Sequence, residues 1–82
     1  MNNLSKDEIS KIYGKIKFVT HLPDYQVQIV DFFPDLKVQL VEFLPNSIGK
    51  WEIVENFPDF KIQIVEHLPD FKIQYVSAFP GI

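Results

Sequence analysis

The stretch KIQIVEHLPDFKIQYV, residues 61–76, contains the tripeptide Lys-Ile-Gln twice, eleven residues apart. The same period covers most of the chain, in which Ile48 and Gly49 alone separate the third unit from the fourth. The six units are KIKFVTHLPDY from Lys15, QVQIVDFFPDL from Gln26, KVQLVEFLPNS from Lys37, KWEIVENFPDF from Lys50, KIQIVEHLPDF from Lys61 and KIQYVSAFPGI from Lys72. A fixed period of this kind predicts a repeat architecture.

Each unit predicts one β-strand followed by one turn. Positions two and four are apolar and alternate with polar positions one and three, which is the period of a strand. Position five is always Val, and position nine is always Pro, followed by Asp, Asn or Gly. Because Pro cannot donate to a strand ladder and breaks a helix, the Pro must lie in the connection. The two adjacent apolar positions, four and five, predict either partial cover on both faces or a bulge.

Two arrangements of the six strands fit this pattern. In a parallel β-solenoid like positions stack, so five Lys at position one would form a column of destabilising like charges. In an antiparallel meander Glu55 lies near Lys61, and Glu66 lies near Lys72. The charge pattern and the short turns favour a mainly β, six-stranded antiparallel meander, folded over into two layers or closed into a barrel. The parallel β-solenoid is the alternative.

The first fourteen residues predict a short helix. Ser5 with Glu8 three residues later forms a capping box, and Leu4 and Ile9 stand at the positions of a hydrophobic staple. We expect a helix from about Lys6 to Tyr13 that packs over one face or end of the sheet. The domain organisation is therefore a single domain over residues 1–82, with a helical cap at 1–14, six β-repeats at 15–82 and a two-residue insertion at 48–49.

Composition argues against several function classes. The net charge is −3 and Arg is absent, so we expect no nucleic-acid partner. No apolar run has the length of a membrane helix, so we expect no membrane span. The first ten residues are polar and acidic and contain no signal peptide. We expect a cytoplasmic protein if the chain is complete, and an exported one if a signal peptide was removed.

The repeated Val-x-x-Phe-Pro-Asp motif, with the stretch GKWEIVENFPDFKIQIV at residues 49–65, resembles a group of short bacterial proteins built from tandem units of this kind. The resemblance extends from Lys15 to Ile82. Some relatives in that group carry a signal peptide and a Cys near the irregular loop, and we expect neither in this chain. The resemblance implies no activity and supplies no catalytic residues.

No residue pattern predicts catalysis, a cofactor or a metal site. His21 and His67 share one position of the unit, and we interpret them as polar residues near turns rather than metal ligands. The Asp residues after Pro are interpreted as turn caps and not as calcium ligands; they are Asp24, Asp35, Asp59 and Asp70. We expect Trp51 to be a core residue. The chain is therefore predicted not to be an enzyme.

The prediction for function is a non-catalytic structural or protein-interaction module that acts through a sheet face or edge. The alternative is a small-ligand-binding or regulatory protein with a pocket between layers. In the last unit, from Lys72, position six is Ser77 and Gly81 replaces the Asp that follows Pro. Because charges discourage edge pairing, this unit is predicted to be an exposed C-terminal edge strand that pairs with a second copy or a protein partner.

Overall fold

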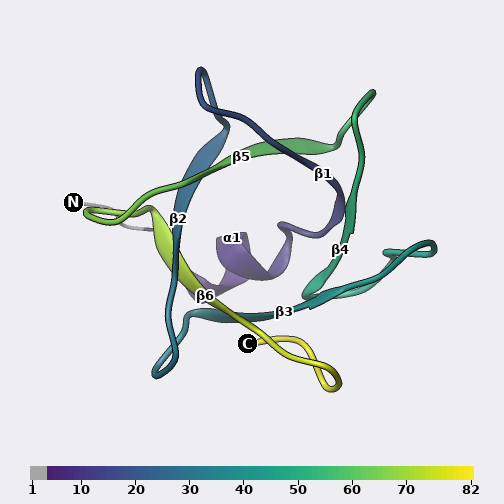
Figure 1. Cartoon of the computed structure of the whole chain (residues 1–82). Helices are drawn as coiled ribbons and strands as arrows, with labels where there is room; N and C mark the ends of the chain where they lie inside the picture. Colours follow the sequence, from purple (N-terminus) through teal and green to yellow (C-terminus); the bar gives the residue numbers. More distant parts are fainter. Residues whose placement is uncertain (1–3) are drawn as a thin grey trace.

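The computed structural model describes residues 4–82, which form one helix and six strands (Figure 1). The helix is α1, Lys6–Ser10. The strands are β1 Gly14–Phe18, β2 Tyr25–Ile29, β3 Leu36–Leu40, β4 Lys50–Ile53, β5 Phe60–Ile64 and β6 Phe71–Tyr75. Each strand covers the first four positions of one repeat unit, and all except β4 begin one residue before that unit.

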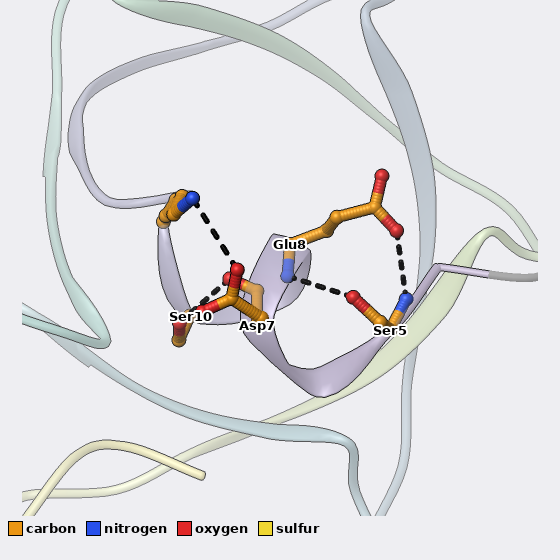
Figure 2. A network of polar contacts seen from close by, with 5 residues as sticks. Ser5, Asp7, Glu8 and Ser10 are labelled. Atoms are coloured by element: carbon orange, nitrogen blue, oxygen red, sulfur yellow. Dashed lines mark hydrogen bonds and ion pairs between the residues drawn. The ribbon is translucent and has the colours of Figure 1, made fainter.

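The capping box at the start of α1 is confirmed (Figure 2). The Glu8 backbone N–H donates to Ser5 Oγ at 3.1 Å, and the Ser5 N–H donates to Glu8 Oε1 at 2.9 Å. The helix ends at Ser10 rather than Tyr13, because the N–H of Lys11 turns back to the carbonyl of Glu8 and the chain then leaves the helical path. Such a tightened last turn is a common helix ending.

The six strands form a closed parallel barrel in the order β1-β4-β3-β6-β2-β5. All six neighbouring pairs are parallel, so the prediction of an antiparallel meander is wrong. The strand direction is that of the parallel alternative, but the strands close around one axis instead of stacking as a solenoid. The number of strands and the short helix agree with the expectation from the sequence, and the closed barrel is one of the two arrangements that the sequence left open.

The chain winds around the barrel in two interleaved laps (Figure 1). The connections after β1, β2, β4 and β5 each pass one strand, so β1, β2 and β3 take every second place and β4, β5 and β6 fill the gaps. The connection between β3 and β4 differs, because it leads to an adjacent strand. It contains the inserted Ile48 and Gly49. The one irregularity in the repeat therefore marks the change from the first lap to the second.

The register explains why the charge argument failed. Position one of each strand lies opposite position three of its neighbour, so Lys15 faces Glu52 and Lys37 faces Gln74. Lysines at position one therefore do not form a column, although Lys17 does face Lys61. The six pairs, each staggered by two residues in the same sense, give a total shear of twelve residues. Such a large shear tilts the strands strongly and lets short connections join parallel strands.

Position two of every strand points into the barrel and is fully buried. Because the stagger is the same at every pair, the six residues form a ring around the axis: Ile16, Val27, Val38, Trp51, Ile62 and Ile73. The prediction that Trp51 is a core residue is confirmed. Ile9 and Ile12, from α1 and the segment after it, belong to the same apolar cluster. The helix therefore packs against one end of the barrel, as expected.

The predicted C-terminal edge strand does not exist. Strand β6 pairs with β2 on one side and with β3 on the other, and Gly81 makes a further antiparallel bridge to Lys37. Because the barrel is closed, β6 has no unpaired side, and the loss of charge at Ser77 and Gly81 has no bearing on edge pairing.

Candidate interaction surface at one end of the barrel

Six large apolar side chains lie where the strands end, one from each strand. They occupy position four and are between 36% and 50% exposed: Phe18, Ile29, Leu40, Ile53, Ile64 and Tyr75. Side chains two residues apart in a strand share a face, so position four points to the same side as the buried position two. We call these six residues the apolar ring. They are the last inward layer of the barrel, and they remain accessible to solvent.

The opposite end of the barrel is closed by α1 (Figure 1). Ile9 and Ile12 are almost fully buried there, and the indole Nε1 of Trp51 donates to the carbonyl oxygen of Ile12 at 2.9 Å. The helix precedes β1, so it lies at the end where the strands begin. The barrel therefore has one end covered by the chain itself and one end that presents the apolar ring.

Position six of each unit stands two residues beyond the end of its strand, next to the apolar ring in sequence, and four of these six residues are acidic. They are Thr20, Asp31, Glu42, Glu55, Glu66 and Ser77, all exposed. Extending the strand register by two residues places Glu42 beside Ile53 and Glu55 beside Phe18. On the other side of the barrel it places Asp31 beside Tyr75. We call these six residues the rim.

The backbone of the rim is held by glutamine side chains from neighbouring strands. Gln39, Gln63 and Gln74 each donate through Nε2 to a rim carbonyl oxygen, at 3.1, 3.2 and 3.0 Å. The carbonyls belong to Ser77, Thr20 and Asp31. This pattern explains why position three is most often Gln, which carries a donor on a side chain long enough to reach the next strand.

Tyr75 is the one ring member with an ionisable side chain. Partial burial among its apolar neighbours raises the pKa of the Tyr75 phenol above its ordinary value. The cause is the burial of part of the Tyr75 side chain, which is still 39% exposed.

The connections carry a second set of exposed apolar residues at position eight. Their side chains are 67–92% exposed, and their φ angles lie between 52° and 57°: Leu22, Phe33, Leu44, Phe57, Leu68 and Phe79. A left-handed backbone is unfavourable for such side chains. The connections project outward around the barrel (Figure 1), so these tips point in different directions and present no common face.

The four Asp residues after Pro are structural, but they do not act within their own turns. Each accepts a hydrogen bond through Oδ2 from the N–H at position one of a neighbouring strand, at 2.7–2.9 Å. The pairs are Asp59 with Lys15, Asp70 with Gln26, Asp24 with Lys61 and Asp35 with Lys72. No local pattern predicts these partners, because 37 or 44 residues separate them in sequence.

His21 and His67 are both exposed and lie in the connections that leave β1 and β5. These two strands are neighbours in the barrel, whereas a meander would have kept them four strands apart. Within residues 4–82, no group of three or more His, Cys, Asp or Glu side chains is placed to hold a metal ion.

A shallow groove of about 390 Å³ lies on the outer wall of the barrel, beside the connection between β5 and β6. It is lined by Gln28, Asp35, Glu66, His67, Leu68, Pro69, Phe71 and Lys72. Asp35 accepts a hydrogen bond from the backbone N–H of Lys72, and the other ionisable side chains of the lining, Glu66, His67 and Lys72, are exposed. The groove lies outside the single closed sheet and is separate from its filled interior.

The fold and the surface together define a class of small repeat-like domain, in which six equivalent units close a parallel barrel along an interleaved path. The chain matches the 7(1) septoil knot domain over residues 9–82, and it therefore belongs to that family. Knotted chains are rare among proteins, and two interleaved laps are a path along which a chain passes around itself. Among curated proteins, no sequence matches this one.

Family membership confirms the expectation of a repeat-like domain rich in β-structure. The repeated Val-x-x-Phe-Pro-Asp motif as the mark of a bacterial group stays a prediction. In the part of the chain that the structure describes, no helix is long and apolar enough to cross a membrane.

Proposed function

We propose that the protein is a non-catalytic interaction module that binds a protein partner through the apolar ring. The sequence predicted an interaction through a sheet face or a sheet edge. Because the closed sheet has no edge, we assign the interaction to the inward face of the sheet where it is exposed at the end of the barrel. The single observation that supports it is the accessibility of six large apolar side chains at one end of the barrel, while α1 closes the other.

Exposure of the six apolar side chains of the ring to water costs free energy, and the fold does not require these side chains to be apolar. Large apolar side chains that gather on one exposed face mark an interaction site more often than an accident of sequence. The ring repeats on all six strands, although a polar residue at position four would be better solvated at a surface that remained in water. Partner binding would remove the ring from water and recover that free energy.

The proposal is tested by comparing two pairs of substitutions that each replace two aliphatic side chains with Ser, in the ring or at the tips. Ile29→Ser with Leu40→Ser alters the ring, and the matched control Leu22→Ser with Leu44→Ser alters the tips away from the groove. Each variant and the unaltered protein is fixed to a support, exposed to lysate and crosslinked, and captured proteins are quantified by mass spectrometry. Circular dichroism checks that both variants fold.

We expect a protein that the unaltered chain and the tip variant capture equally and the ring variant does not. Equal capture by all three proteins contradicts the proposal. Loss of capture in the tip variant alone would assign the interaction to the connections and would also contradict it.

A second candidate function, small-ligand binding, is favoured by the groove on the outer wall. A site of this volume, with apolar Leu68 and Phe71 beside His67 and Glu66, is within the size range of small-molecule pockets. The test is a ligand screen followed through the ring-proton NMR signals of His67, with His21 as the internal control. A compound that shifts both histidines equally would not be a groove ligand.

A further inference from the structure

The acidic residues of the rim form two pairs on opposite sides of the apolar ring. In barrel order, the rim reads Thr20, Glu55, Glu42, Ser77, Asp31 and Glu66. The two neutral residues, Thr20 and Ser77, follow β1 and β6, which are three places apart and therefore lie diametrically opposite. Glu42 and Glu55 follow the neighbouring strands β3 and β4, and Asp31 and Glu66 follow the neighbouring strands β2 and β5 on the other side of the barrel.

This distribution concentrates the negative charge of the protein at one end. The net charge of the chain is −3, and the rim contributes four carboxylates, so the remainder of the chain is net positive by one. At position one of the units, five Lys offset the four Asp that bond to the strand backbones. The potential at the apolar ring is therefore negative, and it favours a partner of positive charge.

The same charge opposes binding of a second copy. If two rings met face to face, four carboxylates of one copy would face four of the other, and like charges brought together at an interface are costly. The opposite end, which α1 covers, offers no compensating positive field, because Lys6 and Lys11 are balanced by Asp7 and Glu8.

We propose that the partner is an amphipathic segment whose apolar face is flanked on both sides by Lys or Arg. It lies across the apolar ring along the neutral line from Thr20 to Ser77, and its cationic flanks meet Glu42 and Glu55 on one side and Asp31 and Glu66 on the other. The whole molecule, with its outward connections, measures 32 × 29 × 21 Å, so a helix of about 10–12 Å diameter can lie across one end of it. This inference rests on the proposed function and adds the chemistry of the partner.

The experiment uses three labelled synthetic peptides with the same leucine face and different flanks, of Lys, Gln or Glu. Binding to the full chain is measured by fluorescence anisotropy at low and high salt. We expect the Leu/Lys peptide to bind most tightly and to weaken as salt rises, since exposed charges are screened. The Leu/Glu peptide should bind weakest.

Two charge variants test whether the acidic residues of the rim, rather than the net charge of the protein, favour binding of the Leu/Lys peptide. Glu42→Gln with Glu55→Gln removes one acidic pair of the rim, and Asp7→Asn with Glu52→Gln makes the same change in net charge away from it. We expect the rim variant to bind the Leu/Lys peptide about threefold to tenfold more weakly, and the control to change by less than about twofold. An equal loss in both variants would overturn the proposal.

Other occupants of the ring are outcomes of the same series. Analytical ultracentrifugation tests for a dimer, and zwitterionic lipid vesicles test for membrane binding. If either association occurs and the variant Ile29→Ser with Leu40→Ser abolishes it, the ring binds a second copy or a lipid surface, and the inference is overturned. A lysate partner that requires the ring, together with equal binding of all three peptides, would refute the charge inference and leave the proposed function in place. If no lysate protein requires the ring and the three peptides also bind equally, both the proposed function and the charge inference are refuted.

Discussion

Trp51 donates from its indole Nε1 to the carbonyl oxygen of Ile12 at 2.9 Å, and both side chains are buried. This bond joins the position-two ring to the segment that connects α1 with β1. Trp51→Phe removes the donor and leaves a buried carbonyl without its partner, so the free energy of unfolding should fall by about 1–3 kcal/mol. Equilibrium urea denaturation measures the change.

The control for this prediction is Ile62→Val, which removes one methyl group from the same ring without touching a hydrogen bond and should cost about 0.5–1.5 kcal/mol. Amide hydrogen exchange separates the two effects, because the amides of Ile9 and Ile12 should lose protection in Trp51→Phe alone. Unchanged exchange at these amides would mean that the indole does not hold the helix in place.

The Asp residues after Pro offer a second test. Asp70 Oδ2 accepts the backbone N–H of Gln26 at 2.7 Å, in a partly buried position. Asp70→Ala removes the acceptor at the start of a strand and should lower the free energy of unfolding by about 1 kcal/mol. Asp70→Asn keeps an acceptor oxygen and should cost less. If both variants lose the same stability, the carboxylate has a role beyond this hydrogen bond.

The strands and the helix cap could be predicted because their causes are local. Alternation of positions one to four produces each strand, Pro at position nine ends it, and Ser5 with Glu8 starts α1. The strand order could not be predicted, because the partners lie far apart: Asp59 bonds to Lys15 across 44 residues. Neighbouring strands are staggered by two residues, which puts position one against position three. The charge argument against parallel strands failed because it assumed that equivalent positions lie side by side.

The candidate surface had only a partial signal in the sequence. Positions four and five were both apolar, as in Ile64-Val65, and alternation did not explain why. In the structure the strand ends at position four, whose side chains form the apolar ring, and Val65 only continues the ladder with an N–H to the carbonyl of Val27. The side chains at position four lie together at one end because the barrel is closed, and the sequence of a single unit does not predict that closure.

Gly49 lies where the chain passes from the first lap to the second, with φ +82°. A Cβ at this position would clash with the carbonyl oxygen of Lys37 and with Pro80. Gly49→Ala combines that clash with an unfavourable backbone, so it should lower the free energy of unfolding by about 2 kcal/mol or more. Thermal and urea unfolding measure it.

Gly81 is the matched control, because it also has a positive φ, +138°, but an added Cβ would meet only Ile48 Cγ2 at 3.9 Å. Gly81→Ala should therefore cost only about 1 kcal/mol, which reflects the backbone alone. Equal effects of the two substitutions would show that the close approach at Gly49 does not limit the fold.

Phe57 represents the tips: its side chain is 91% exposed and its φ is 57°. Asn adopts this backbone region more readily than Phe, and little apolar burial is lost, so Phe57→Asn should raise the free energy of unfolding by about 0.5–1 kcal/mol. Phe57→Ala keeps the unfavourable backbone and should bring no comparable gain. A loss of stability in Phe57→Asn would show that the tip side chain makes contacts that stabilise the fold.

Tyr75 reports on the apolar ring through its pKa. Burial raises the pKa of Tyr75 above the ordinary tyrosine value of about 10, so the folded state holds the phenolic proton more tightly than the unfolded state. Its contribution to stability is therefore complete below the unfolded pKa and is lost as pH rises from there through the folded pKa. A partner on the ring removes more water, so a bound Leu/Gln peptide, which brings no charge to the phenol, should raise the Tyr75 pKa further, measured by the absorbance of tyrosinate. The Tyr75→Phe variant should lack the late-titrating step, and Tyr13→Phe should retain it. A titration that the bound peptide leaves unchanged would place the peptide somewhere other than the ring.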